Sequence, residues 1–186
     1  MNNRHLFARS LALCTPFAIL ALLAFPISAQ RGPSTLASRI DVTRRNYAAG
    51  PEDPEAVYEG ARIVHNVTVH REKGMQVHAK FSVRHGINTP CMLIAYFYYD
   101  AAAPTPLKTD DPEYRDQKGG VATRVNFTPA YDPALYEDLQ LFMPYKALNM
   151  ESGQTYQLKF YLALYDKEGG RFFGKSGWYK FNLTMP

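Results

Sequence analysis

Strict alternation of apolar and polar residues is the sequence feature that most restricts the fold of this chain. In the segment GMQVHAKFSV, residues 74–83, every second residue from Met75 to Val83 is apolar and the residues between are polar. A period of two is typical of a β-strand with one buried face and one solvated face. A similar run covers residues 61–69, and the polar turn REKG at 71–74 would join the two runs as a hairpin.

Further short strands are predicted along the rest of the chain. The segment CMLIAYFYYD at 91–100 is apolar on both faces, which is typical of a central strand. Three prolines and a Gly-Gly pair favour a long loop over residues 101–120. Alternating runs predict strands at 121–127, 139–143, 156–165, 171–174 and 178–183, with a short helical turn at 145–150. We therefore expect an all-β protein: an antiparallel β-sandwich of about seven or eight strands, immunoglobulin-like or C2-like.

The first 29 residues have the pattern of a secretory signal peptide. Arg4 and Arg9 precede an apolar run from Phe17 to Phe25, and the small pair Ser28-Ala29 follows it. A membrane anchor is disfavoured because a span needs about 18 uninterrupted apolar residues, and Cys14-Thr15-Pro16 interrupts this segment. We expect cleavage after Ala29, no transmembrane segment in the mature chain, and a periplasmic or extracellular location.

Between the signal peptide and the strands, residues 30–58 are rich in Pro, Ser, Arg and Gly and lack periodicity. This composition predicts a flexible spacer, followed by one β-sandwich domain at 59–186. The chain carries a net charge of +4, and removal of Arg4 and Arg9 would leave +2. No run of Lys or Arg is present, so a nucleic-acid partner is not expected. Once the signal peptide is removed, Cys91 would be the one cysteine, and its apolar strand predicts a buried thiol.

No pattern in the sequence indicates catalysis. The chain has no G-x-S-x-G elbow, no H-E-x-x-H pair and no phosphate-binding glycine loop ahead of a helix. The four histidines after residue 29 all lie in the predicted hairpin region: His65, His70, His78 and His85. If Val69 pairs with Met75, then His65 and His78 lie on opposite faces of the sheet, so they do not converge as zinc ligands. We expect His65 in the core, His78 on the polar face, and no enzyme activity, cofactor or metal.

An acidic loop supports a second hypothesis. Asp110, Asp111, Glu113 and Asp116 lie in the predicted long loop, and Asp100 lies at its start. Calcium binds six to eight oxygen ligands, and sandwich loops of the C2 type supply them. The spacing matches no ordered calcium loop, and the prolines fix much of the backbone. A solvated acidic loop is therefore the preferred interpretation, with a calcium- or lipid-responsive C2-like sandwich as the alternative.

The aromatic content is the strongest indication of function. Aromatic residues make up 13% of the chain, and most of them are expected to fill the sandwich core. Alternation directs the others outward, where tyrosines commonly form contact surfaces. We predict partner-binding roles for Tyr114, Tyr131, Tyr145 and Trp178. The sequence thus favours an exported, non-catalytic interaction module that binds a protein or a cell-envelope component.

Several short segments also resemble a bacterial extracytoplasmic β-sandwich module of unassigned function, which occurs as a C-terminal appendage of larger proteins. The resemblance rests on HNV at 65–67, GM at 74–75 with His78 and Phe81, AYF at 95–97, YR at 114–115, FTP at 127–129, LFMPY at 141–145, LKFY at 158–161 and SGW at 176–178. It covers about residues 61–184 and implies a fold, without catalytic residues.

Overall fold

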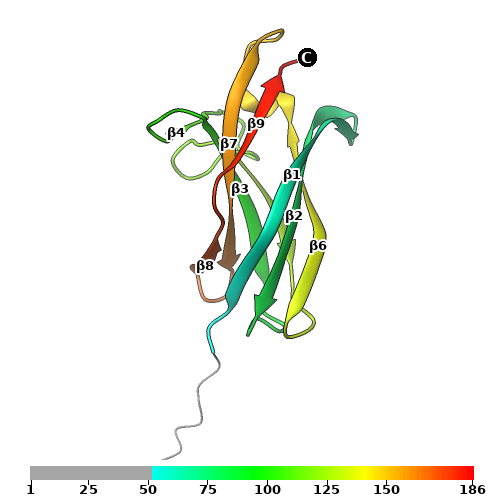
Figure 1. Ribbon diagram of the computed structural model, residues 1–186, viewed down its shortest axis with the longest axis vertical. Coiled ribbons are helices and arrows are strands. Elements are labelled where there is room, and N and C mark those ends of the chain that lie inside the picture. Colours follow the sequence, from blue (N-terminus) through cyan, green and yellow to red (C-terminus); the bar gives the residue numbers. More distant parts are fainter. Residues whose placement is uncertain (1–51) are drawn as a thin grey trace, which may run out of the picture. The chain divides into compact units, whose positions relative to one another are not determined.

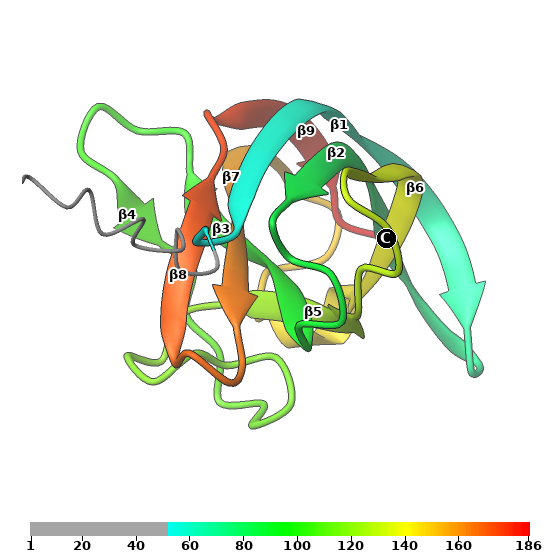
Figure 2. The same ribbon diagram turned by 90° about the horizontal axis from the view of Figure 1, so that it is seen from below.

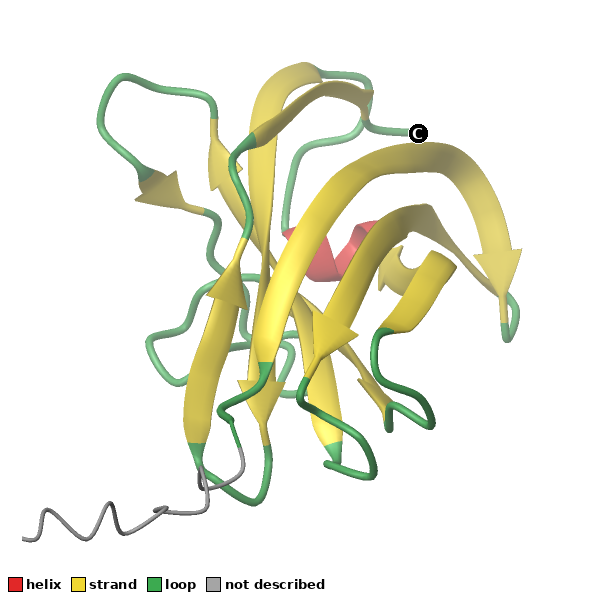
Figure 3. Cartoon of the chain, turned by 60° about the horizontal axis from the view of Figure 1, so that its bottom comes forward, coloured by secondary structure: helices red, strands yellow, loops and turns green. Residues whose placement is uncertain are grey.

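The structure is a computed structural model that describes residues 52–186. The signal peptide expected at 1–29 and the spacer region 30–51 lie outside the described residues. The elements are β1 (Glu55–Val69), β2 (Glu72–Arg84), β3 (Cys91–Tyr99), β4 (Thr105–Pro106), β5 (Ala122–Phe127), β6 (Ala134–Pro144), the 3₁₀ helix η1 (Tyr145–Leu148), β7 (Thr155–Asp166), β8 (Arg171–Lys175) and β9 (Tyr179–Thr184). Figure 3 shows that strands dominate, with η1 as a short helical turn where the sequence predicts one.

The strands form two antiparallel sheets, which confirms the predicted β-sandwich (Figures 1 and 2). In sheet A, β2 lies between β1 and β6. In sheet B, β3 and β7 are the central strands; β4 and β5 pair with the free side of β3, and β8 and β9 pair with the free side of β7. The described chain has nine strands, more than the predicted seven or eight, because the two-residue strand β4 lies in the segment predicted as a loop.

The strand order is immunoglobulin-like. Strands β1, β2 and β6 occupy the places of A, B and E, while β3, β7 and β8/β9 occupy those of C, F and G. A second feature of that fold is a tyrosine near the start of strand F whose hydroxyl bonds to the backbone just upstream. Here the Glu151 N–H donates to the Tyr156 hydroxyl at 3.2 Å. Both observations favour the immunoglobulin-like arrangement over the C2-like one.

The alternation in β2 produces one side of the core. Met75, Val77, Ala79, Phe81 and Val83 are all fully buried, as the sequence predicts. They face the buried residues of β3 and β7, which are Leu93, Ala95, Phe97, Leu158, Phe160, Leu162 and Leu164. Each large apolar side chain buried in this way stabilises the fold by about 1.5–3 kcal/mol. The sandwich is therefore held by packing, and Cys91 is a free, buried cysteine.

The hairpin of β1 and β2 has a different register from the predicted one. Val69 pairs with Glu72, so the connecting turn consists of two residues, His70 and Arg71, with φ of 49° and 70°. The predicted pairing of Val69 with Met75 is therefore wrong, because Glu72 and Lys73 belong to β2. Two consecutive residues with positive φ give a turn whose twist matches that of the flanking strands, which explains why the hairpin closes so early.

The position of His65 at the edge of the sandwich, just before a bulge in β1, overturns its core assignment. His65 pairs with Met75, but the next pair joins Val67 to Gly74, so Asn66 is an extra residue with φ of 59°. His65 faces the same side as Met75, yet it is exposed, because it lies at the edge of the sandwich with its ring 6.2 Å from that of Phe181. The core assignment of His65 is therefore wrong. His78 is on the opposite face, as predicted, since it pairs with Arg62.

The first strand, β1, begins earlier in the chain than the sequence predicts. Strand β1 starts at Glu55, four residues before the expected domain start at 59, and Glu55 pairs with Arg84 at the end of β2. No helix in the described part of the chain is long and apolar enough to cross a membrane.

Candidate functional site: an aromatic groove on sheet B

The candidate site lies on the outer face of sheet B, where β3 and β7 run side by side. Residues of β3 that alternate with its core positions point outward, and the pairing of the two strands sets them beside the outward residues of β7. Met92 pairs with Tyr165, Ile94 with Ala163, and Tyr96 with Tyr161. Because the pairs are directly opposite, each contributes neighbouring side chains to one surface. The result is a surface of aromatic and aliphatic side chains outside the core.

A groove exists here because small residues lie between large ones. Ala122 of β5 pairs with Tyr96, and Ala163 of β7 pairs with Ile94 and lies between Tyr161 and Tyr165 along its strand, so short side chains alternate with large ones on this face. The groove has a volume of about 730 Å³. Binding sites for ligands usually have volumes of roughly 300–1,000 Å³ and are lined mainly by apolar and aromatic side chains. The size and the lining of the groove therefore fall within the range of known binding sites, which makes it a candidate site.

One wall of the groove is formed by the loop between β4 and β5, which Figure 2 shows beside sheet B. Isolated β-bridges join Lys108 to Gly120 and Arg115 to Val121. Inside the loop, the Asp116 carboxylate accepts hydrogen bonds from the N–H groups of Lys118 at 2.8 Å and Gly120 at 2.6 Å. These contacts hold the backbone of the loop that carries Arg115 and Lys118, so this wall of the groove has a defined structure.

The aromatic rings of the groove pack mainly on one another. Tyr96 stacks on Tyr161 with 5.1 Å between ring centroids, and Phe172 packs edge-to-face on Tyr165 at 5.1 Å. The Lys175 ammonium lies 4.3 Å from the centroid of the Tyr161 ring, a cation–π contact. Phe172 is 58% exposed, and a large apolar side chain left in water at the edge of a groove is typical of a contact residue.

The Tyr96 and Tyr161 hydroxyl groups are neutral at physiological pH. Burial, with a further contribution from Asp116, raises the pKa of Tyr96. Burial is also the main cause that raises the pKa of Tyr161, and the nearby Tyr98 raises it further. A neutral phenol both donates and accepts hydrogen bonds, so these groups suit recognition. In the described chain, no His, Cys or Ser lines the groove, and its one carboxylate, Asp116, is engaged by the loop backbone.

The four residues predicted from the sequence to bind a partner do not converge. Trp178 is 42% exposed and packs edge-to-face on Tyr98 and Tyr161, both at 5.1 Å, so it borders the groove. Tyr131, 75% exposed, lies in the loop between β5 and β6. Tyr114 is half-buried against the core. Tyr145 is buried, and its hydroxyl accepts the Asn66 N–H at 2.9 Å, so its ring has a packing role.

Sequence reasoning missed the residues at the centre of the groove. In β7, Leu158, Phe160, Leu162 and Leu164 alternate with the residues between them, so the outward direction of Tyr161 and Tyr165 could have been read from the sequence. Tyr96 lies in a segment that is apolar on both faces, so its direction could not. The sequence gives no comparable signal for Arg115 and Lys118, which lie in a loop. Their position depends on how the loop folds back onto sheet B.

Asp111, one of the acidic residues of the loop, stabilises a local turn of the backbone. The Asp111 carboxylate accepts the Glu113 N–H at 3.0 Å, and the Asp111 N–H donates to the Thr109 hydroxyl at 3.1 Å. Side chains that bond to the backbone two residues away are typical of Asx and Ser/Thr turns. Among residues 52–186, no group of three or more His, Cys, Asp or Glu side chains is arranged to hold a metal ion.

Cys91 is fully buried at the start of β3, as the sequence predicts. Burial, with a smaller contribution from Asp166, raises the pKa of the Cys91 thiol to about 11. Since the thiolate is the reactive form, this thiol is inert at neutral pH in the folded protein.

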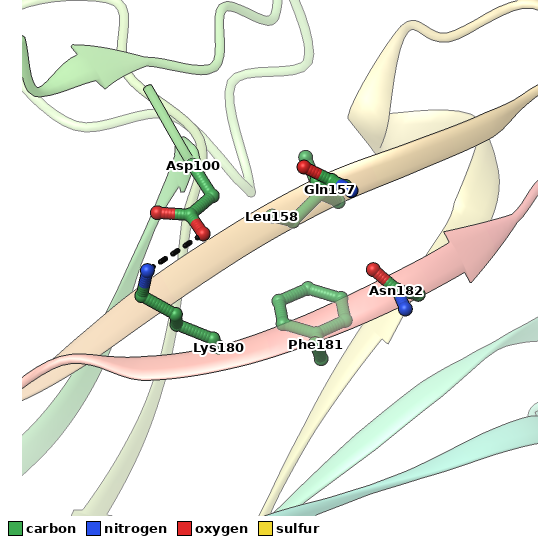
Figure 4. Close-up of a pocket in the computed structure, with 6 residues that line it drawn as sticks. All are labelled: Asp100, Gln157, Leu158, Lys180, Phe181 and Asn182. Carbon is green, nitrogen blue, oxygen red and sulfur yellow. Dashed lines mark ion pairs between the residues drawn. The ribbon is translucent and has the colours of Figure 1, made fainter. Parts of the chain in front are cut away.

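A second, smaller recess of about 260 Å³ lies between β7 and β9 (Figure 4). Its charged groups already pair with each other: Asp100 lies 2.9 Å from the Lys180 ammonium and 3.5 Å from that of Lys159. The hydrogen bond from Lys180 is the main reason that the pKa of Asp100 is lowered. A recess whose charges are mutually neutralised offers little to a ligand, so the groove on sheet B is the better candidate.

Comparison with known proteins finds no matching family model and no curated protein of significant similarity. The function is therefore argued from the geometry of the groove.

Proposed function

We propose that this chain is an exported, non-catalytic interaction module, and that the groove on the outer face of sheet B binds a protein or cell-envelope partner. The observation that carries the proposal is an aromatic groove of about 730 Å³ whose lining contains no Ser, Cys or His and whose one carboxylate, Asp116, is bonded to the loop backbone. Export rests on the signal-like pattern of residues 1–29.

The composition of the groove supports binding over chemistry. Tyrosine, tryptophan and arginine are enriched among the residues that carry most of the energy of protein interfaces. Here Tyr98 and Tyr161 pack against Trp178, and Tyr96, Arg115 and Arg124 line the same groove. A hydrolase or transferase would need a nucleophile or a general base positioned within hydrogen-bond reach of its substrate.

Site-specific photo-cross-linking tests this proposal. A photoreactive phenylalanine analogue placed at Phe172 is expected to form an adduct with a partner in the cell envelope, identified by mass spectrometry. Leu135 is the matched control, because it is 56% exposed but lies on β6 of sheet A. Equal adducts at both positions, or an adduct at Leu135 alone, would contradict the proposal. A third probe at Tyr131 examines the loop between β5 and β6.

A further inference from the structure

The charges around the groove identify the chemistry of its occupant, if the proposed function holds. Four cations line it: Arg115, Lys118, Arg124 and Lys175. None of them has a carboxylate partner within 4.0 Å among the described residues, whereas Lys80, Lys159 and Arg171 elsewhere do. The one acidic side chain of the groove, Asp116, accepts two backbone N–H groups of its own loop. The groove therefore has a positive charge that the domain itself does not neutralise.

The outer face of sheet A provides a contrast within the same domain. There the Lys80 ammonium lies 3.1 Å from Glu59 and 2.8 Å from Glu137, and His78 lies 2.6 Å from Asp138. Cations on that face are thus matched by acids of neighbouring strands. Interfaces are generally complementary in charge, so an uncompensated positive groove predicts an acidic partner surface.

The arrangement of the cations gives the length and pattern of the occupant. Arg124 of β5 pairs with Ile94 of β3, Ile94 with Ala163 of β7, and Ala163 with Lys175 of β8. This row crosses three inter-strand spacings of about 4.8 Å, or about 14 Å in all, which about four to five extended residues would span. Because the middle of the row is apolar and its ends are cationic, it matches a large apolar side chain between acidic residues.

The packing of the rings favours a polypeptide over a polysaccharide or a nucleic acid. Sugars and bases bind to aromatic residues through free ring faces. In this groove Tyr96 and Tyr161 stack on each other, and Lys175 covers Tyr161. These contacts occupy ring faces of Tyr96 and Tyr161, whose neutral hydroxyls suit the carbonyl and carboxylate groups of a peptide.

From these observations we infer that the groove binds an extended acidic segment of a partner polypeptide, in which acidic residues flank a large apolar side chain. The inference rests on the proposed function and adds the chemical class of the partner.

The test is an unbiased selection of displayed random 12-residue peptides on the purified protein, followed by affinity measurements on the selected peptides. We expect peptides rich in Asp and Glu around one aromatic residue or leucine. The triple variant Arg115→Gln, Lys118→Gln, Lys175→Gln is expected to raise Kd at least about tenfold and to weaken its salt dependence.

The matched control is Lys73→Gln, Arg84→Gln, Lys167→Gln. It removes the same charge from exposed positions outside the groove and is expected to change Kd less than about twofold. Selection of neutral or basic peptides, or equal binding of acidic peptides to both triple variants, would overturn the inference. So would groove-dependent binding of oligogalacturonate, an acidic sugar, without any selected peptide; that result would leave the proposed function intact. If no peptide is selected and no cross-link forms at Phe172, the proposed function itself is wrong.

Discussion

Asp100 lies directly after β3 between two lysine ammonium groups, at 2.9 Å from Lys180 and 3.5 Å from Lys159. These contacts lower the pKa of Asp100 below its usual 3.8, Lys180 being the main cause. A depressed pKa means that the carboxylate stabilises the fold above pH 3.8, and that this stabilisation is lost as the pH falls through the lowered value. Lys180→Gln should therefore reduce stability near neutral pH and flatten its decline in acid.

Unfolding free energies measured by urea denaturation between about pH 5 and about pH 3 would check this expectation. Lys167→Gln is the control, because Lys167 is exposed and has no carboxylate within 4.0 Å in the described chain. If the free energy of unfolding falls with the same slope between about pH 5 and about pH 3 in the Lys180→Gln variant and in the unaltered protein, Lys180 does not stabilise the Asp100 carboxylate.

Single residues also show where sequence reasoning succeeds and where it fails. Val77 and Phe81 could be placed in the core from alternation alone, and both are fully buried. His65 has the same alternating pattern but is exposed, because burial also depends on whether the other sheet reaches far enough to cover a position. That depends on strand length and sheet pairing, which no local pattern encodes.

At the scale of elements, Gly74 of β2 lies in tight contact with β6. A methyl group there would overlap the Met143 carbonyl oxygen and lie 2.8 Å from the Phe142 ring, whereas one at Gly60 meets nothing within 4 Å. We expect Gly74→Ala to lower the free energy of unfolding by about 1–3 kcal/mol, because the strand must shift. Gly60→Ala should change it by less than about 0.5 kcal/mol.

Chemical denaturation of both variants measures the difference. Equal effects at Gly74 and Gly60 would mean that β2 and β6 separate readily and that the close approach does not constrain them.

The hairpin of β1 and β2 shows why elements are easier to predict than their registers. Both strands could be recognised from their period of two. Their register depends on the positive φ angles of His70 and Arg71 and on the bulge at Asn66. Residues other than glycine adopt such angles only where the surrounding structure holds them, and the Asn66 N–H is bonded to Tyr145, which is distant in the sequence.

For the whole molecule, the sequence predicts export with cleavage after Ala29. The intact mass of the secreted protein is expected to correspond to a chain that begins at Gln30. Ala29→Phe replaces the small residue that cleavage requires, so this variant should keep its first 29 residues. A secreted protein that begins at another residue, or normal processing of Ala29→Phe, would contradict the prediction.

The fold class could be predicted for the whole molecule, because alternating strands and polar turns are local features. The groove could not, since it brings together residues 92–98, 115–118 and 161–175. These segments meet only because β3 pairs with β7 and the intervening loop folds against them. A site of this kind is a property of the sheet, and no short motif marks it.

Trp178 borders this groove and is the one tryptophan of the chain. Its indole ring lies edge-on to Tyr98 and Tyr161, and the Lys159 ammonium lies 5.2 Å from the ring. Because no other indole contributes, the fluorescence of the unlabelled protein reports on this single position. An occupant that displaces water from the neighbouring tyrosines would shift the emission of Trp178, so the protein contains its own optical reporter of binding.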